Sequence, residues 1–493
     1  MSDLTGQLLA LTVGYLVLLI VLGWLGRRAR KASTLSDHYL AGHSLGFLVL
    51  LLTLFATQYS GNSLSAFPGK TYRGGLSYFM SVTFMVAIVA GYLPFAPRLV
   101  KLARRRSYLT PSDYLVDRFG SVRLATAASV IFTVALCNYL LAQLIAMGNA
   151  FAGISDGAVP YTAGVIGGAT IILIYELMGG MRAVAWTDML QGGAMFIGIG
   201  CVVLVIWNVI GSPAEIVGTI AASAPQKVAA PSVTACITWI STCALLGFGA
   251  PLYPQAIQRL YAAASTRELR RSLAVMSFLP LFAVTAVVYI GLAGLVQRPG
   301  LSTQESDRIT FLVLSDLVEL EPLARLPVLL VMLAVVSAIM STADSSLLSL
   351  SSIATKDFFA RAKGLTDQQA EGLTSQARII SVVVMGLIVT LALRPPTTLW
   401  RLLEIKFEIL IQLSPAFLFG TLHDKDDPRG YDVVDISIGL ALGLVVGLTL
   451  YALGMTKVGG LHAGVIGLLV NFAAVLLSRV LRRRGGLAGS MEA

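Results

Sequence analysis

Apolar residues along this chain come in long runs separated by short polar segments. The runs number about thirteen and are roughly 20 residues long, the length that a helix needs to cross a ~30 Å hydrocarbon layer. A membrane β-barrel is excluded, because its strands would alternate apolar and polar residues over ~10 positions. The pattern predicts an all-α, polytopic membrane protein with spans near residues 6–26, 45–67, 76–97, 123–149, 158–179, 186–210, 233–256, 272–296, 325–354, 376–393, 399–421, 433–454 and 461–481.

Two of these runs are interrupted by glycine, proline and polar residues at mid-span depth. The second run contains ATQYSGNSLSAFPGK and the seventh contains LLGFGAPLYPQ. Non-helical backbone at that depth survives only where it is buried in protein or lines a cavity. The interruptions lie five spans apart, and broken helices in corresponding positions are typical of the binding site of a transporter with an inverted repeat. The alternative is that glycine and proline merely kink these two helices.

Composition and charge agree with a membrane protein and indicate its orientation. Hydrophobic residues make up 56% of the 493 residues and charged residues 13%, with a mean hydropathy of +0.79. The net charge of +10 comes mainly from alternate loops, which carry RRARK, RLVKLARRR, the group from Arg259 to Arg271, and KDFFARAK. Because basic loops stay in the cytoplasm, we expect the N-terminus outside and the C-terminus inside. Topology explains the basic excess, so no nucleic-acid partner is expected.

The sequence gives no support to an enzyme. It contains no nucleophile motif and no phosphate-binding loop, and its four histidines are scattered without metal-ligand spacing. No soluble domain fits between the spans, since the longest predicted extramembrane segment covers about residues 299–324.

A stripe of hydroxyl side chains runs along the ninth span. Its serines recur four or three residues apart, which places them on one helix face, and Thr342 and Asp344 widen the stripe. Hard cations such as Na⁺ bind several oxygens at close range, and hydroxyls with freed backbone carbonyls supply them. Single hydroxyls more often bond back to the helix or to a neighbouring helix. The serines of the stripe are Ser337, Ser341, Ser345, Ser349 and Ser352.

Several charged residues lie within or beside spans. Asp188 begins the sixth span, where it either binds a cation or pairs with Arg182. The eleventh span carries Glu404, Lys406 and Glu408, for which the sequence alone assigns no role. At the outer end of the second span, a basic pair either attracts an anion or anchors at the headgroups. This pair is Lys70 and Arg73.

Six segments, in this order, resemble the sodium:solute symporter family, whose members transport sugars, proline, pantothenate, sialic acid and monocarboxylates. They are DHYLAGHSLG, ATQYSGNS, YELMGGMRAVAWTDMLQ, AIQRLYAAAS, AIMSTADSS and IATKDFF, and the resemblance runs from about Ser36 to Gly420. It implies a LeuT-type fold with two inverted repeats of five helices, at 45–210 and 233–421. One extra helix at 6–26 would precede the repeats, and two at 433–481 would follow.

The resemblance also implies ligands for sodium. The principal Na⁺ site would use the backbone carbonyls of Ala56, Tyr59 and Ala338 with the hydroxyls of Ser341 and Thr342. A second Na⁺ site, where the family has one, would combine Asp188 with Ser345. Asp344 stands beside Ser345, where related transporters often have a neutral residue, and it could strengthen cation binding, accept a proton or pair with a basic residue.

The solute is expected beside the two interruptions. Similarity points to side chains from the second and seventh spans, with weaker candidates on neighbouring spans. The acid–amide pair that sugar transporters carry in the first interruption is absent, because Asn62 and Ser63 stand there. A sugar is therefore disfavoured, and a small carboxylate or amino-acid-like solute is favoured. The first group is Gln58, Ser60, Asn62, Ser63, Tyr253 and Gln255, and the weaker group is Asn138, Gln143 and Gln412.

The sequence thus predicts a Na⁺-coupled symporter of the inner membrane that imports a small polar organic solute. Its expected partners are that solute, Na⁺ and the lipid bilayer. Two alternatives remain open: a symporter coupled to protons, and a transporter-like sensor that signals to another protein.

Overall fold

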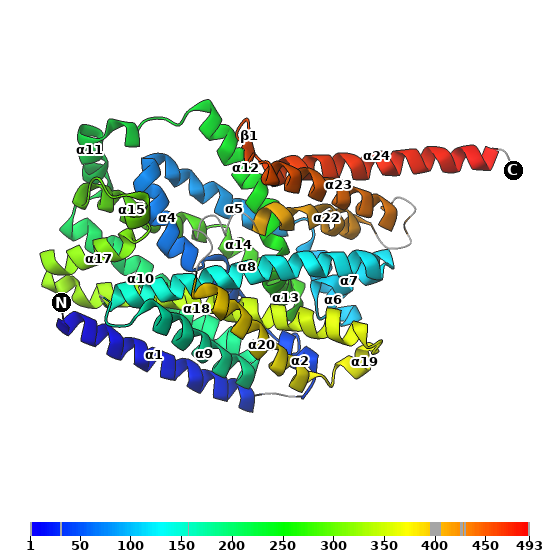
Figure 1. Ribbon diagram of the computed structural model, residues 1–493, viewed down its shortest axis with the longest axis horizontal. Coiled ribbons are helices and arrows are strands. Elements are labelled where there is room, and N and C mark those ends of the chain that lie inside the picture. The colour runs from blue at the N-terminus through cyan, green and yellow to red at the C-terminus, as the bar shows by residue number, and fades with distance from the viewer. Residues whose placement is uncertain are drawn as a thin grey trace.

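The computed structural model describes residues 2–29, 32–155, 157–394, 406–423, 427 and 430–491, and these residues are almost entirely helical. In Figure 1 the N-terminus lies at the left and the C-terminus at the right, where α24 extends beyond the helices around it. The first part of the chain forms α1 (Ser2–Arg28), α2 (Leu35–Leu40), α3 (Phe47–Gln58), α4 (Gly61–Gly74), η1 (Gly75–Met80), α5 (Ser81–Tyr92), α6 (Ala96–Arg106), α7 (Pro111–Phe119), α8 (Val122–Ile154), α9 (Tyr161–Gly179) and α10 (Met181–Val209).

The second part repeats the alternation of long and short helices and ends in a helical pair. It forms α11 (Pro213–Ser223), η2 (Pro225–Lys227), α12 (Val233–Gly249), η3 (Ala250–Leu252), α13 (Pro254–Ala262), α14 (Thr266–Met276), α15 (Leu279–Gln297), α16 (Thr303–Ser306), α17 (Ile309–Leu320), η4 (Pro322–Ala324), α18 (Arg325–Ile353), the π-helix η5 (Ala354–Ala360), α19 (Asp367–Ala370), α20 (Thr374–Ala392), η6 (Ile411–Leu413), α22 (Ser414–Leu422), α23 (Val433–Ala452), the strands β1 (Lys457–Val458) and β2 (Leu461–His462), and α24 (Ala463–Met491).

The described residues include 11 helices that are long and apolar enough to span a membrane. The predicted span at 45–67 is not one of these 11 helices, because it is divided between α3 and α4. The predicted span at 399–421 lies partly outside the described residues. The sixth span begins earlier than predicted, at Met181 instead of residue 186. The all-α, polytopic class is confirmed.

Both predicted interruptions are breaks in the helices. The first separates α3 from α4 at Tyr59 and Ser60, whose backbones are extended. The second separates α12 from α13, with η3 between them. Proline lacks an N–H and clashes with the preceding turn in a helix interior, so Pro251 and Pro254 end one helix and begin the next.

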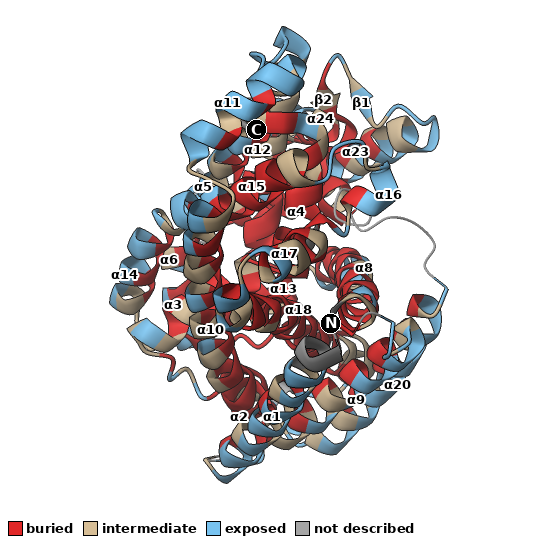
Figure 2. Cartoon of the chain, turned by 90° about the vertical axis from the view of Figure 1, so that its left-hand side faces the viewer, coloured by how far each residue is buried: buried red, intermediate tan, exposed pale blue. Residues whose placement is uncertain are grey.

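Helix α18 forms the centre of the bundle. It contacts α8, α10, α3 and α4, and every residue from Val331 to Ile353 is buried except Leu333. Figure 2 shows buried residues around α18, α8 and α13, with exposed residues on outer helices such as α1 and α20. The exposed apolar side chains on these outer helices are those expected to face lipid. The hydroxyl stripe of α18 therefore lies in protein and not in lipid.

Side-chain hydrogen bonds join α13 to the C-terminal end of α18. The Ser349 hydroxyl donates to Oε1 of Gln258 at 2.5 Å, and Nε2 of Gln258 donates to the Ser352 hydroxyl at 2.6 Å. These bonds account for the last two serines of the stripe.

Candidate functional site

A small cavity lies between the two breaks. Its volume is about 60 Å³, room for about two water molecules at the ~30 Å³ that each occupies in the liquid. Polar and aromatic side chains of the breaks face apolar side chains of α5 and α12 across it. The lining residues are Leu54, Thr57, Gln58, Ser60, Ser63, Phe67, Phe84, Met85, Ile88, Tyr92, Tyr139, Leu246, Ala250, Tyr253, Ala256, Lys406 and Phe407.

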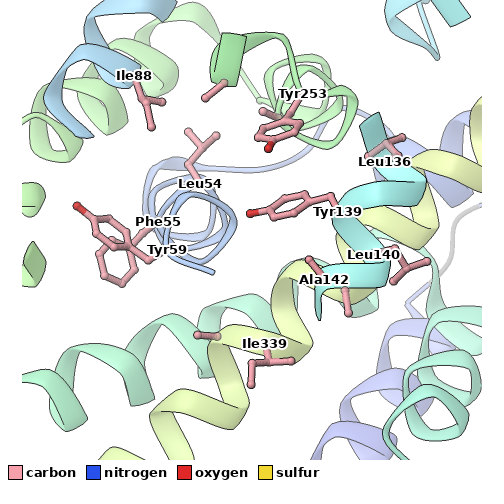
Figure 3. Packing of buried hydrophobic residues seen from close by; sticks show 14 of the residues in the cluster. Leu54, Phe55, Tyr59, Ile88, Leu136, Tyr139, Leu140, Ala142, Tyr253 and Ile339 are labelled. Atoms are coloured by element: carbon pink, nitrogen blue, oxygen red, sulfur yellow. The ribbon is translucent and has the colours of Figure 1, made fainter. Parts of the chain in front are cut away.

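Two stacked tyrosines form one wall of this cavity. The rings of Tyr139 in α8 and Tyr253 in the second break are 5.0 Å apart and nearly parallel, with 6° between their planes. Figure 3 shows Tyr139 directed toward the first broken helix, with Tyr253 beside it. The Tyr139 hydroxyl lies beside the hydroxyls of Ser60 and Thr342. This tyrosine therefore connects the cavity, the first break and the α18 stripe.

Four of the predicted solute residues line the cavity: Gln58, Ser60, Ser63 and Tyr253. Gln58 donates through Nε2 to the Met85 carbonyl at 3.0 Å, while its buried Oε1 has no partner among the described residues. The buried Tyr253 hydroxyl is also without a partner there. Buried polar atoms in native proteins are nearly always hydrogen-bonded, so these two atoms are suited to contact water or a ligand in the cavity.

The other predicted solute residues lie elsewhere. Gln143 and Gln255 are buried with both side-chain amide atoms unpartnered among the described residues, but they are not part of the cavity wall. Asn138 does not line the cavity either. Gln412 faces α24, where its Nε2 donates to the Gly464 carbonyl at 2.8 Å. The side chain of Asn62 lies outside the described residues.

The predicted sodium ligands lie on two elements in close contact. Ala56 and Tyr59 lie at the end of α3, where the last-turn carbonyls have no N–H partner within the helix. Gly61 begins α4 directly against α18, and a Cβ there would lie well under 3.0 Å from Cγ1 of Ile339. Only glycine fits this position without a shift of its neighbours, so its presence lets α4 begin directly against Ile339 of α18.

The two predicted hydroxyl ligands on α18 donate their protons to different acceptors. Ser341 donates to Oδ1 of Asp188 at 2.5 Å, and Thr342 donates to the Ala338 carbonyl at 3.0 Å. A hydroxyl that ligates a cation must use a lone pair for the ion and place its proton elsewhere. The donor set is therefore compatible with Na⁺.

Asp188 belongs to a fully buried ion pair. Its Oδ2 accepts from Nη2 of Arg259 at 2.6 Å, and the side chains are 0% and 1% exposed. The Thr53 hydroxyl also donates to this oxygen and accepts from Nε of Arg259 at 2.7 Å. Ser341 completes the surroundings of the carboxylate, so Asp188 connects α10 to α3, α13 and α18.

The alternative pairing of Asp188 with Arg182 is wrong. Arg182 donates to Asp37 at 2.7 Å and to the Ala41 carbonyl at 3.2 Å. Helices α9 and α10 meet at Gly180, whose φ is +57°. A Cβ at this position would collide with His38. Arg182 lies directly after this tight turn and points toward α2, whereas Asp188 lies further along α10.

Asp344 is buried beside the same ion pair. Its Oδ2 accepts from the Tyr175 hydroxyl at 2.7 Å, and its Oδ1 accepts from the Ser345 hydroxyl at 3.1 Å. Ser345 also accepts from Arg259. Asp344 forms no ion pair with another described residue, so the group consists of two carboxylates and one guanidinium.

Sequence reasoning missed two residues of this region, Arg259 and Tyr139, and assigned no role to a third, Lys406. Arg259 was assigned to the cytoplasmic basic group, which is wrong, because α13 continues past residue 256 and turns the guanidinium inward. Lys406 was recognised as unusual in an apolar segment, and the structure places it on the cavity wall. For Tyr139, the sequence offered no signal beyond a tyrosine in a membrane span.

The remaining charged candidates make local contacts. Glu408 accepts from the Gly464 N–H and lies 3.4 Å from Nδ1 of His462, whereas Glu404 lies outside the described residues. Arg73 pairs with Asp307 at 2.8 Å and donates to the Thr303 carbonyl. Arg73 thus fixes the end of α4 to the segment around α16.

Comparison with known proteins agrees with this geometry. The sodium:solute symporter family profile matches residues 38–430. The chain is 26% identical over 481 residues to the sodium/pantothenate symporter of Escherichia coli strain K12, with 94% of each chain covered. It is 24% identical to the osmoregulated proline transporter OpuE of Bacillus subtilis strain 168, covering 95% of this chain and 94% of the relative.

Among solved structures, a substrate-bound, outward-open Na⁺-coupled sialic acid symporter superposes with a TM-score of 0.75 at 20% identity. The match covers 97% of this chain and 98% of that one, and the expected LeuT-type fold is confirmed. The chain therefore belongs to the sodium:solute symporter family and is a Na⁺-coupled membrane transporter, not an enzyme.

Proposed function

We propose that this protein imports a small carboxylate or amino-acid-like solute with Na⁺, binding the solute in the cavity between the breaks. The sodium ligands are the carbonyls of Ala56, Tyr59 and Ala338 with the hydroxyls of Ser341 and Thr342. The observation that carries the proposal is the contact between the first break and α18, made by Gly61 against Ile339. A cation between these elements would join a broken backbone to a polar helix face.

Coupling follows from where these ligands lie. Two of the carbonyls come from the first broken helix, and the remaining three ligands come from α18. Sodium binding therefore stabilises the state in which the two elements are together, and separation of the elements toward the cytoplasm releases the ion. A ligand shifts a conformational equilibrium only by its differential affinity for the two states. The solute acts in the same way if it contacts Gln58 and Ser60 on the first break.

The arrangement of the helices supports two repeats and an orientation suited to uptake. The proposed repeats, 45–210 and 233–421, each begin with a broken helix. The basic residues of α6 and the C-terminus lie at the opposite end from the N-terminus, α11 and α17 (Figure 1). Together with the positive-inside rule, this arrangement supports an N-terminus outside and a C-terminus in the cytoplasm.

The preference for a carboxylate or amino-acid-like solute has two supports. The acid–amide pair expected of a sugar site is absent from the first break. Relatives over nearly the whole chain are named for pantothenate and proline. Arg73 is paired with Asp307, so its charge does not add to this preference.

A second cation is favoured by the charge of the Asp188 group. Its members, Asp188, Asp344 and Arg259, sum to one negative charge when all are ionised. A buried charge needs a partner, and a second Na⁺ at Asp188, Asp344 and Ser345 would supply it. A proton on Asp344 is the alternative.

Reconstitution of the purified protein into liposomes tests the proposed function. We expect uptake of radiolabelled pantothenate, proline or propionate to be driven by an inward Na⁺ gradient. Uptake that follows a proton gradient and ignores Na⁺ would contradict the sodium proposal. Absence of net uptake for every solute, with Na⁺ still stabilising the protein, would favour the sensor.

A further inference from the structure

Lys406 is a fully buried lysine on the wall of the central cavity. Its side chain is 1% exposed. Its Nζ lies 3.2 Å from the centroid of the Tyr139 ring and 5.2 Å from those of Tyr253 and Phe407. Cation–π contacts of this kind stabilise an ammonium group, but they supply no negative charge.

No carboxylate is paired with Lys406 among the described residues. Glu408, the described acidic residue nearest to it in sequence, faces the other way, toward Gly464 and His462. Among the described residues that line the cavity there is no aspartate, glutamate or arginine, so Lys406 is the single charged side chain of that set. An ammonium taken out of water is costly without a counter-charge. The ammonium group of Lys406 is therefore a positive charge without a counter-charge among the described residues of the cavity.

We propose that Lys406 binds the carboxylate of the transported solute, and that this solute is a compact monocarboxylate with one negative charge and no ammonium group. The inference rests on the proposed function, since it assigns the solute class of the same cavity. The carboxylate lies against Nζ of Lys406, and the remainder of the solute contacts Leu54, Ile88 and Ala250.

The charges of the wall discriminate among solutes. A zwitterionic amino acid would bring an ammonium group into a cavity whose described wall has no carboxylate to accept it. A dicarboxylate would leave its second charge without a cation. A neutral amide or sugar would leave Lys406 without a counter-charge. Selection against a wrong solute through unpaired buried charge is stronger than selection by shape alone.

Polar atoms near the Lys406 ammonium group are suited to orient the carboxylate of the solute. The Tyr253 hydroxyl is unpartnered among the described residues and belongs to one of the rings that contact Lys406. Serine hydroxyls of the first break line the same cavity at Ser60 and Ser63. A carboxylate held by Lys406 and these donors would connect the two broken helices.

The test compares three solutes of similar size in proteoliposomes under an inward Na⁺ gradient: propionate, L-alanine and propionamide. We expect propionate uptake to be saturable and to exceed uptake of the other two. Lys406→Met keeps an unbranched side chain one atom shorter than lysine and removes the charge, so uptake kcat/KM for propionate should fall ~30-fold or more. Lys406→Arg should retain part of the activity, and Lys101→Met, at an exposed position of α6, should have no effect.

A second measurement separates loss of the solute site from loss of folding or of sodium binding. Na⁺-induced thermal stabilisation of Lys406→Met should equal that of the wild type. Wild-type uptake that prefers L-alanine or propionamide, Lys406→Met with undiminished propionate uptake, or no saturable propionate uptake at all would each overturn the assignment. Saturable propionate uptake that depends on Lys406 but not on Na⁺ would contradict the proposed function instead.

Discussion

Replacing Arg259 with methionine removes the cation from a buried group that contains Asp188 and Asp344. Arg259 donates hydrogen bonds to Asp188, Thr53, Ser345 and the Gln255 carbonyl. With all groups ionised, its loss changes the formal charge of the group from −1 to −2. Breaking a buried ion pair from one side typically costs ~3–5 kcal/mol, so we expect Arg259→Met to lower the free energy of unfolding by that amount.

The opposite substitution, Asp188→Asn, should be milder. It changes the formal charge of the group from −1 to 0, because Asp344 remains near Arg259 through Ser345. The expected loss is about 1.5–3 kcal/mol, the range for a hydrogen bond to a charged group. In the double variant, the asparagine removes one of the uncompensated carboxylates, so the double variant should be more stable than Arg259→Met alone.

Unfolding of the purified variants by SDS titration in detergent measures these differences. The same titration at increasing NaCl, with choline chloride holding ionic strength constant, tests the second cation. Na⁺ should stabilise Arg259→Met more than the wild type, since binding to the folded state adds RT ln(1 + [Na⁺]/Kd). Equal losses for the two single variants, or a double variant that shows simple additivity, would refute the reasoning about charge.

Two further predictions concern packing and a buried carboxylate. Gly61→Ala should cost about 1–3 kcal/mol through overpacking against Ile339 and should slow Na⁺-driven uptake, whereas Gly167→Ala, with open space at its Cβ, should change neither thermal stability nor transport. Asp357→Ala should lower the melting temperature more than Asp357→Asn, which keeps an acceptor oxygen; equal melting temperatures would contradict this. The hydroxyls that donate to Asp357 are those of Thr110, Ser112 and Ser129.

The spans and both breaks could be predicted from the sequence because hydrocarbon imposes a strong rule on the backbone. A membrane helix must be apolar and about 20 residues long, and Gly–Pro segments with polar neighbours violate that rule visibly. The position of Gly61 against Ile339 required the structure, because close approach of two helices leaves no local signal beyond the glycine itself.

Charged residues at the span ends were assigned less well. Arg259 was placed with the cytoplasmic arginines because it follows the apolar part of its span by only a few residues. In the structure Arg259 is instead paired with the buried carboxylate of Asp188. The two residues are 71 positions apart, so no local sequence pattern indicates the pair. Lys406 poses the same difficulty, since its environment is made by Tyr139 and Tyr253 from two distant helices.

The most direct test of the sodium site is binding of radioactive sodium to the purified protein, which requires no knowledge of the solute. Ser341→Ala and Thr342→Ala should each weaken saturable binding about tenfold or more, as expected from ~1.5–3 kcal/mol for a polar contact to a charge. Ser346→Ala is the matched control, because this hydroxyl bonds back to the Thr342 carbonyl. Wild-type affinity in Ser341→Ala and Thr342→Ala would contradict the proposed site.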